Sequence, residues 1–223
     1  MLRDGFGRFH NYLRISLTER CNLRCVYCMP EDGVPLQPAE RLLSSEEIAR
    51  VTAMFAAAGV DKVRLTGGEP LLRKDLPDIV GAIRANPAVR NVGITTNGML
   101  LERRLPELQQ AGLTHINVSV DTLDPAKFSR ITRRPPGGLG RALGAIEAAL
   151  AAGYGSSVPG GSSDVSSSDG GGGGGGGGRL KVNCVVMGGV NDEELGDFLR
   201  LGETAAVDVR FIEWMPFDDN RWE

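Results

Sequence analysis

The sequence predicts an α/β fold, a partial (β/α)6 TIM-like barrel of parallel strands. Two observations support this prediction. Short runs rich in β-branched residues alternate with longer helical patterns, which is typical of βαβ units around a parallel sheet. Residues suited to chemistry follow these runs, and in parallel barrels the site lies on loops at the carboxyl ends of the strands. The expected strands are residues 12–17, 62–66, 91–96, 115–120, 180–187 and 208–215.

Helical segments lie between the expected strands. Residues 44–59 begin with two serines followed by two glutamates and end at Gly59, which is a good pair of helix caps. Residues 101–112 contain Pro106, and we expect the helix there to be limited to the stretch after the proline, because proline lacks the N–H that a helix interior uses. The other expected helices are residues 75–86, 139–153 and 191–205.

One segment, residues 155–178, is a low-complexity run of serine and glycine. Such a run cannot bury a core, so we expect a flexible insertion within a single domain that spans residues 1–223. A phosphate-binding loop is the alternative, but that motif needs a preceding strand and a Gly-Lys-Ser/Thr that opens a helix. Here a helix precedes and a strand follows, so the insertion is expected to loop out opposite the site.

Composition excludes some classes of partner. The chain has 223 residues, with 25 basic and 28 acidic side chains and a formal net charge of −3. This balance predicts no binding to nucleic acid or to an anionic membrane, although a local basic pocket remains open. No apolar run approaches the roughly 18 residues of a membrane span. The first residues lack the pattern of a signal or transit peptide, so either the protein stays where it is made or a leader lies outside this sequence.

Three cysteines lie close together in "ERCNLRCVYCMP": Cys21, Cys25 and Cys28. A structural zinc site uses four ligands, and neither His10 nor His115 lies at a ligand spacing from this loop. Iron–sulfur clusters use thiolates, so three cysteines on a 4Fe–4S cluster would leave one iron open to a small molecule. The alternative is three incidental or buried cysteines.

The C-x3-C-x2-C spacing, with Tyr27 before the last cysteine, resembles the radical S-adenosylmethionine (SAM) superfamily. The likeness narrows with "GRFHNYLRISLTERCN", "VRLTGGEPLLRKDL", "ITTNGMLL", "INVSVDTLDPAKFSRIT", "KVNCVVMGGVNDEE" and "RFIEWMPF". Together these stretches are similar to the molybdenum cofactor biosynthesis protein A family of GTP 3′,8-cyclases. The similarity covers essentially the whole chain except the Ser/Gly insertion.

The resemblance implies a radical SAM lyase with one 4Fe–4S cluster held by the three clustered cysteines, and SAM on the open iron. One-electron reduction would cleave SAM to methionine and a 5′-deoxyadenosyl radical. The reaction would convert GTP to 3′,8-cyclo-7,8-dihydro-GTP, the first step of molybdopterin (molybdenum cofactor) biosynthesis. The implied partners are GTP, an external electron donor and cyclic pyranopterin monophosphate synthase, which would take the product; a homodimer remains open.

The resemblance also implies SAM-binding residues: Tyr27, Gly68, Glu69, Ser119 and Met215. Tyr27 would lie near the adenine, Glu69 has a carboxylate suited to the ammonium group, and Met215 would pack on the adenosine. Each has a structural alternative: a packing aromatic for Tyr27, a glycine turn for "GGEP" and core filling for Met215. Ser119 shares the strand-end level with "GGEP", which favours a place in the site.

For GTP, the implied residues are Arg14, Arg64, Thr95 and Lys181. A polyphosphate needs a local cluster of basic side chains. Arg14 and Arg64 lie in otherwise apolar strand runs, where a charge is costly without a partner, so a bound anion would explain both. Solvated charges or internal ion pairs are the alternative for all three basic residues. Cys184 alternates with valines and is expected to be a core residue.

One feature of the family is absent from this sequence. Its members carry a further C-terminal portion with a second three-cysteine cluster that binds the guanine, whereas no cysteine follows Cys184 here. The sequence is then a fragment or a truncated product, expected to bind one cluster and SAM and to cyclise GTP weakly or not at all. The alternatives are another radical SAM enzyme, such as a peptide-modifying one, or a non-catalytic Fe–S or zinc protein. The expected location is the mitochondrial matrix if the protein is eukaryotic and the cytoplasm if it is bacterial.

Overall fold

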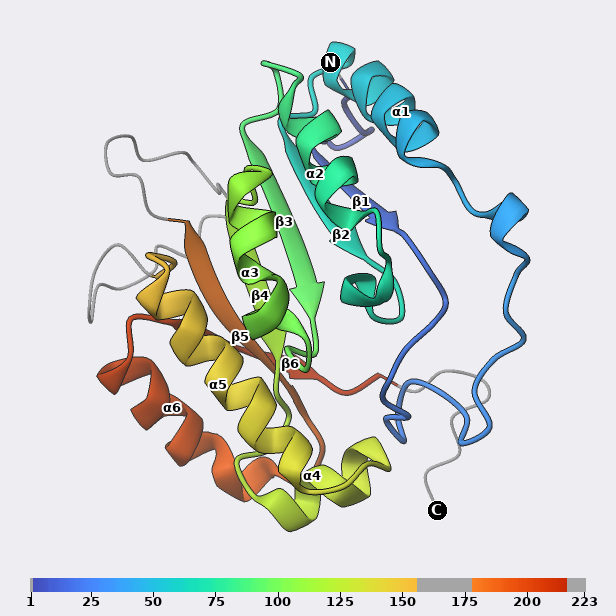
Figure 1. The fold of residues 1–223 in the computed structure, drawn as a ribbon. Coiled ribbons are helices and arrows are strands. Elements are labelled where there is room, and N and C mark those ends of the chain that lie inside the picture. Colours follow the sequence, from blue (N-terminus) through green and yellow to red (C-terminus); the bar gives the residue numbers. More distant parts are fainter. Residues whose placement is uncertain (1, 156–177, 216–223) are drawn as a thin grey trace.

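A computed structural model describes residues 2–155 and 178–215 of the chain and contains one open sheet (Figure 1). Its strands lie in sequence order, and all neighbours are parallel. They are β1 (Tyr12–Ser16), β2 (Lys62–Thr66), β3 (Asn91–Thr96), β4 (His115–Ser119), β5 (Arg179–Val186) and β6 (Asp208–Glu213). In the described part of the chain β1 and β6 are the two edges, so the predicted partial barrel is confirmed.

The helices cover one face of the sheet, as Figure 1 shows for α2, α3 and α5. They are α1 (Ser45–Ala57), α2 (Leu76–Arg84), α3 (Leu101–Gln110), α4 (Pro125–Thr132), α5 (Gly137–Ala151) and α6 (Leu195–Thr204), with short 3-10 turns η1 (Ala39–Arg41), η2 (Pro70–Leu72) and η3 (Asp192–Glu194). Their apolar residues pack against the sheet in one continuous core. None of the helices in the described ranges is long and apolar enough to cross a membrane.

The caps of α1 are those that the sequence predicts. The Ser44 hydroxyl accepts a hydrogen bond from the Glu47 amide at 3.2 Å, and the Glu47 carboxylate accepts one from the Ser44 amide at 2.8 Å. This reciprocal pair satisfies two amides that the first turn leaves without helical partners. Gly59 follows the helix with φ 104°, a conformation that glycine adopts without steric cost.

The prediction for Pro106 was wrong. Helix α3 begins at Leu101 and continues through the proline to Gln110. Leu101, Leu105 and Leu108 are all buried, so apolar contacts hold the turns on both sides of Pro106 against the core. Pro106 itself is exposed, so water can reach the carbonyl that the proline leaves without a donor.

Helix α4 lies where the sequence analysis predicted none. The Asp124 carboxylate accepts a hydrogen bond from the Lys127 amide at 2.8 Å, and Pro125 occupies the first turn. Both are ordinary signals of a helix start, so the sequence contained the evidence for this element.

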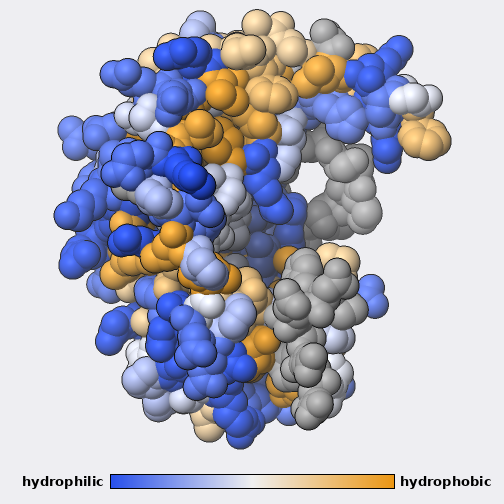
Figure 2. Space-filling view, turned by 90° about the vertical axis from the view of Figure 1, so that its right-hand side faces the viewer, coloured by the Kyte–Doolittle hydropathy of each residue, from blue (hydrophilic) through white to orange (hydrophobic). Residues whose placement is uncertain are grey.

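The two faces of the sheet differ in chemistry. Val63, Leu65, Ile94 and Val118 point to the helices and belong to the core. The alternate positions form the inner face of the half-barrel, because neighbouring side chains on a strand point to opposite sides. Basic side chains are concentrated there: Arg14, Lys62, Arg64, Arg179, Lys181 and Arg210. Figure 2 shows a hollow in the molecular surface with hydrophilic side chains at its mouth.

The expected insertion at 155–178 lies outside the described residues except at its two ends. There the Gly155 amide donates a hydrogen bond to the Gly178 carbonyl at 2.8 Å. Gly178 immediately precedes β5, so this junction lies at the amino end of the sheet. The chain therefore leaves and re-enters the domain on the side away from the carboxyl ends of the strands.

Candidate active site

The three-cysteine loop follows β1 at the carboxyl edge of the sheet. Cys21 and Cys25 are half-buried and Cys28 is exposed. The amides of Cys28 and Met29 both donate to the Cys25 carbonyl, at 2.9 and 3.0 Å, which forms a tight turn between the last two cysteines. The backbone between the last two cysteines therefore has a defined turn.

The glycines of "GGEP" make room for this loop. A side chain at Gly68 would place its Cβ 2.3 Å from the Arg20 carbonyl oxygen, and one at Gly67 would lie 2.4 Å from the Thr18 carbonyl oxygen. Gly68 and Glu69 donate their amides to Thr18 and Arg20, both at 2.7 Å. The absent side chains thus let the loop after β2 approach the backbone of Thr18 and Arg20. This explanation for the two glycines differs from the ligand contact that the sequence suggested.

Glu69 is fully buried, and its carboxylate links its own loop to the end of β3. Its Oε1 accepts from the Leu71 amide at 3.0 Å and from the Thr96 hydroxyl at 2.7 Å, and its Oε2 accepts from the Asn97 amide at 2.7 Å. Burial raises the pKa of the carboxyl group, while these hydrogen bonds oppose the rise. A carboxylate has about four acceptor positions, so about one remains for a ligand.

Asn97 connects the end of β3 to the cysteine loop. Its side-chain amide donates to Asn22 Oδ1 at 2.7 Å and lies 4.0 Å from Cys21 Sγ. The Leu23 amide donates to the same sulfur at 3.4 Å. Two N–H groups therefore point to Cys21, and hydrogen bonds to cluster sulfurs are one means by which proteins tune iron–sulfur centres.

Tyr27 is fixed by a residue that the sequence analysis left out of the site, Asp121. The Tyr27 hydroxyl donates to Asp121 Oδ2 at 2.7 Å, and the Val185 amide donates to Oδ1 at 2.9 Å. Burial raises the pKa of Asp121 to about 6, although both hydrogen bonds lower it. Asp121 thereby joins the cysteine loop to β5. It directly follows the apolar run "HINVSV", a position at a strand end that could have identified it.

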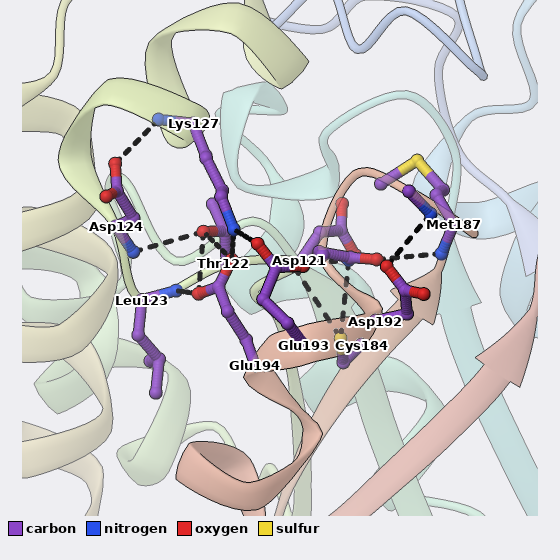
Figure 3. A network of polar contacts seen from close by, with 12 residues as sticks. Asp121, Thr122, Leu123, Asp124, Lys127, Cys184, Met187, Asp192, Glu193 and Glu194 are labelled. Atoms are coloured by element: carbon purple, nitrogen blue, oxygen red, sulfur yellow. Dashed lines mark hydrogen bonds and ion pairs between the residues drawn. The ribbon is translucent and has the colours of Figure 1, made fainter.

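A polar network continues from Asp121 into the β4–α4 loop (Figure 3). The Thr122 hydroxyl donates to both oxygens of Glu194, at 2.7 and 2.9 Å, and the Leu123 amide donates to Glu194 at 2.7 Å. Lys127 forms an ion pair with Glu194 at 3.0 Å. These bonds hold η3 against the β4–α4 loop and α4, and so they fix the backbone that follows Asp121. Cys184 is buried beside it in the core, as predicted.

The three neighbouring cysteines are the type of donor that an iron–sulfur cluster uses. Burial raises the pKa of Cys21, Cys25 and Cys28, and the neighbouring thiols add to the rise for Cys21 and Cys25. Among the described residues no three Cys, His, Asp or Glu side chains converge as ligands of one metal ion. A 4Fe–4S cluster is held by cysteine thiolates, which a loop of three neighbouring thiols supplies, so the donor set fits that group.

The residues expected to bind GTP share the inner face. Arg14 is exposed and pairs in register with Arg64, which is only 6% exposed. The Arg64 guanidinium donates to the Ile94 carbonyl at 3.1 Å and to Asn117 Oδ1 at 2.8 Å, and both partners are uncharged. A Cβ at Gly93 would lie 2.8 Å from the guanidinium carbon, so the glycine provides the space for it.

Thr95 and Lys181 lie in the next row of the same face. Thr95 pairs with Asn117, Asn117 with Lys181, and Lys181 with Asp208. Lys181 is buried, and Ser119 lies two residues beyond Asn117 at the carboxyl end of β4. The structure therefore brings Arg14, Arg64, Thr95 and Lys181 onto one surface.

Met215 lies beyond the carboxyl end of β6. It follows β6 at the end of the described residues and is 63% exposed, so it is not a core residue. Sequence reasoning also missed Lys62 and Arg210, which occupy inner-face positions on β2 and β6. The alternation of side chains along each strand is the signal that could have found both.

Comparisons with known proteins agree with this geometry. The profile of the family described as "Radical SAM superfamily" matches residues 15–162. The chain is 52% identical over 221 residues to molybdenum cofactor biosynthesis protein 1 of Bos taurus, covering 99% of this chain and 31% of that protein. It is 47% identical to the mitochondrial GTP 3′,8-cyclase of Arabidopsis thaliana, covering 100% of this chain and 50% of that protein. The chain thus spans a third to a half of the length of these relatives.

Solved structures share the fold. The structure of Streptococcus suis SuiB bound to S-adenosylmethionine superposes with a TM-score of 0.67 at 16% identity, covering 95% of this chain and 42% of that one. At this identity the likeness concerns the fold alone. The open parallel sheet, the three-cysteine loop at its carboxyl edge and the family profile lead to one conclusion: the chain belongs to the radical SAM superfamily.

Proposed function

We propose that this chain is the radical SAM core of a GTP 3′,8-cyclase. Membership of the superfamily implies one 4Fe–4S cluster and SAM. In our proposal Cys21, Cys25 and Cys28 hold the cluster. When bound, the cluster and SAM would supply the one-electron chemistry that takes a hydrogen atom from the ribose 3′ carbon of GTP. Closure of that carbon onto carbon 8 of the guanine would be completed by one further electron, from the external donor, and one proton.

The chain's residues would position the two substrates. SAM would lie at the carboxyl ends of β2 and β4, near Tyr27, Gly68, Glu69 and Ser119, with Met215 reaching it from the end of β6. Asp121 would hold the Tyr27 ring in place through the hydroxyl.

The triphosphate of GTP would lie on the inner face. The observation that carries this proposal is the environment of Arg64: a buried cation whose hydrogen-bond partners are uncharged. Removing a cation from water is costly unless an anion accompanies it. Arg14, Lys181 and Thr95 lie on the same face, and a polyphosphate would supply a negative charge opposite Arg64 and accept hydrogen bonds from this face.

The cluster assignment is tested by anaerobic reconstitution with iron and sulfide, followed by dithionite and SAM. We expect roughly four irons per chain and release of 5′-deoxyadenosine. Cys25→Ala should abolish both, whereas Cys184→Ala, a substitution of the core cysteine, should leave both unchanged. Binding of zinc without SAM cleavage would refute the enzyme assignment and favour a metal-binding module.

The substrate assignment is tested separately by binding. Calorimetry on the reconstituted chain with SAM should show GTP binding at least tenfold more tightly than guanosine, because the phosphates supply the charge. Arg64→Met should remove most of this preference, and Arg103→Ala, on the exposed side of α3, should not. SAM cleavage without any preference for GTP would point to another radical SAM activity, such as peptide modification.

The remaining parts of the proposal concern the whole protein. We propose a single core domain over residues 1–223, with the Ser/Gly segment as an insertion. We expect this chain alone to cyclise GTP weakly or not at all, because the guanine-binding cysteines expected from the family are not in its sequence. An external donor would supply the electron, and cyclic pyranopterin monophosphate synthase would consume the product. A homodimer and a mitochondrial location, by analogy with the Arabidopsis relative, belong to the same proposal.

A further inference from the structure

The cysteine loop is paired with the end of helix α4, more than a hundred residues later in the chain. The Arg24 amide donates to the Thr132 carbonyl at 3.0 Å, and the Val26 amide donates to the Ile131 carbonyl at 2.9 Å. The last carbonyls of a helix have no partners inside the helix. Here two of them accept hydrogen bonds from amides that lie between the cluster cysteines.

Two arginines after α4 complete this contact. Arg134 Nε donates to the Asn22 carbonyl at 2.7 Å. The Arg133 guanidinium donates to the carbonyls of Arg24 and Met29, both at 3.3 Å. Two of their acceptors lie between the first and second cysteines, and the third directly follows the last cysteine. Guanidinium groups are well suited to this role, because several N–H donors lie in one rigid plane.

The backbone of Arg133 is unusual. Its φ of 52° and ψ of 40° are left-handed, and in the described part of the chain it is the one residue other than glycine with a positive φ. Glycine is the residue that ends helices in this conformation without steric cost. An arginine here is strained, and strained backbone that is retained commonly accompanies a functional constraint.

We propose that Arg133 and Arg134 are positioning residues that hold the cysteine loop against the end of α4. They act through the loop's carbonyls and need not touch SAM or GTP. The left-handed turn ends the helix so that the carbonyls of Ile131 and Thr132 are free for the loop, and it directs the Arg133 guanidinium back across the cysteines. The inference rests on the proposed function only in taking this loop as the cluster loop.

The test compares hydrogen exchange at the Arg24 and Val26 amides in the metal-free chain, measured by NMR. Arg134→Ala and Arg133→Gly should each accelerate exchange at these two amides by about tenfold, the effect of losing one charged hydrogen bond. Amides in the sheet should keep their protection. Arg133→Gly should not lower the melting temperature, since glycine relieves the backbone strain. Arg130→Ala, an exposed arginine in the last turn of α4, is the matched control.

A second measurement separates positioning from folding. After reconstitution, the variants should bind the same amount of iron as the original chain but need several-fold more SAM to change the EPR spectrum of the reduced cluster. Arg133→Asn, which tolerates the left-handed backbone but is too short to reach, should behave like Arg133→Gly and serves if the glycine variant does not fold.

Two outcomes overturn the inference: exchange at both amides within twofold of the original chain, or equal acceleration throughout the sheet. Failure of the chain to take up iron would instead refute the proposed function. The exchange comparison would remain valid in that case, because it uses metal-free protein.

Discussion

Replacing Glu69 by glutamine tests whether this carboxylate holds the site together. The substitution preserves shape but turns one of two acceptor oxygens into an NH2 donor. If the new NH2 replaces Oε2, it faces the Asn97 amide across a distance that is 2.7 Å now. If it replaces Oε1, it faces the Leu71 amide, now at 3.0 Å, and the Thr96 hydroxyl, which can rotate to accept. Either way one buried backbone N–H loses its partner.

The size of the effect follows from this count. A buried donor without a partner costs about 1–3 kcal/mol, and the loss of a charged acceptor adds to it. Burial disfavours the charged form of Glu69, as the raised pKa of its carboxyl group shows. Glutamine removes this buried charge, and that gain offsets part of the lost stability. We therefore expect Glu69→Gln to lower the free energy of unfolding by about 2 kcal/mol, which for a chain of this size corresponds to roughly 4–8 °C in Tm.

The assay is thermal and urea unfolding of the metal-free chain at pH 7, followed by circular dichroism. Glu102→Gln, an exposed glutamate in α3, is the matched control and should change stability by less than about 0.5 kcal/mol. If Glu69→Gln unfolds within 1 °C of the original chain, the hydrogen bonds to Thr96 and Asn97 are not what joins the "GGEP" loop to β3, and our account of this residue is refuted.

Three further predictions concern other parts of the molecule. Gly93→Ala should displace the Arg64 guanidinium, whose carbon would lie 2.8 Å from the new Cβ, and weaken GTP binding at least tenfold in calorimetry; unchanged affinity would contradict the anion site. Asp121 has a pKa of about 6 in the folded chain, whereas an aspartate in the unfolded chain has its ordinary pKa of 3.8. The folded state therefore binds more protons between these values, and the stability that Asp121 contributes falls as pH rises from about 4 to 6. Urea titrations across that range should show the original chain losing about 3 kcal/mol relative to Asp121→Asn, and parallel curves would contradict this. Pro106→Ala should raise Tm by a few degrees, because it restores a helical hydrogen bond to the Glu102 carbonyl, and a lower Tm would show that the proline is not a defect in α3.

The sheet and the location of the site could be predicted from the sequence. Strand-like runs alternate with helical ones, and in parallel sheets all carboxyl ends meet at one edge, so a cysteine loop after β1 and "GGEP" after β2 had to be neighbours. The helix around Pro106 could not be predicted in the same way. Whether the helix continues through Pro106 depends on how well Leu101, Leu105 and Leu108 are buried against the core. This burial outweighs the hydrogen bond that the proline removes.

The internal geometry of the site was less accessible. The need for glycine at position 68 comes from the Arg20 carbonyl, and a backbone contact between two loops leaves no pattern in either loop's sequence. The link between Tyr27 and Asp121 spans 94 positions and depends on how β4 and the cysteine loop approach each other. Lys62 and Arg210, by contrast, were missed although strand alternation, with Arg64 marking the inner face, could have predicted both.

The inner face of the half-barrel has a consequence for folding. Arg14 and Arg64 are register partners on adjacent strands, whose backbones are about 4.8 Å apart. The Arg64 guanidinium extends over β3 and β4, and like charges on one face of a sheet repel. With no anion between them, this repulsion opposes closure of the sheet. A polyphosphate would therefore stabilise the fold as well as occupy the site, by about 2.7 kcal/mol at a hundred times its Kd. The stability of the ligand-free chain should then rise with ionic strength, since salt screens the repulsion, and an anion bound on this face would help to hold β1 to β2.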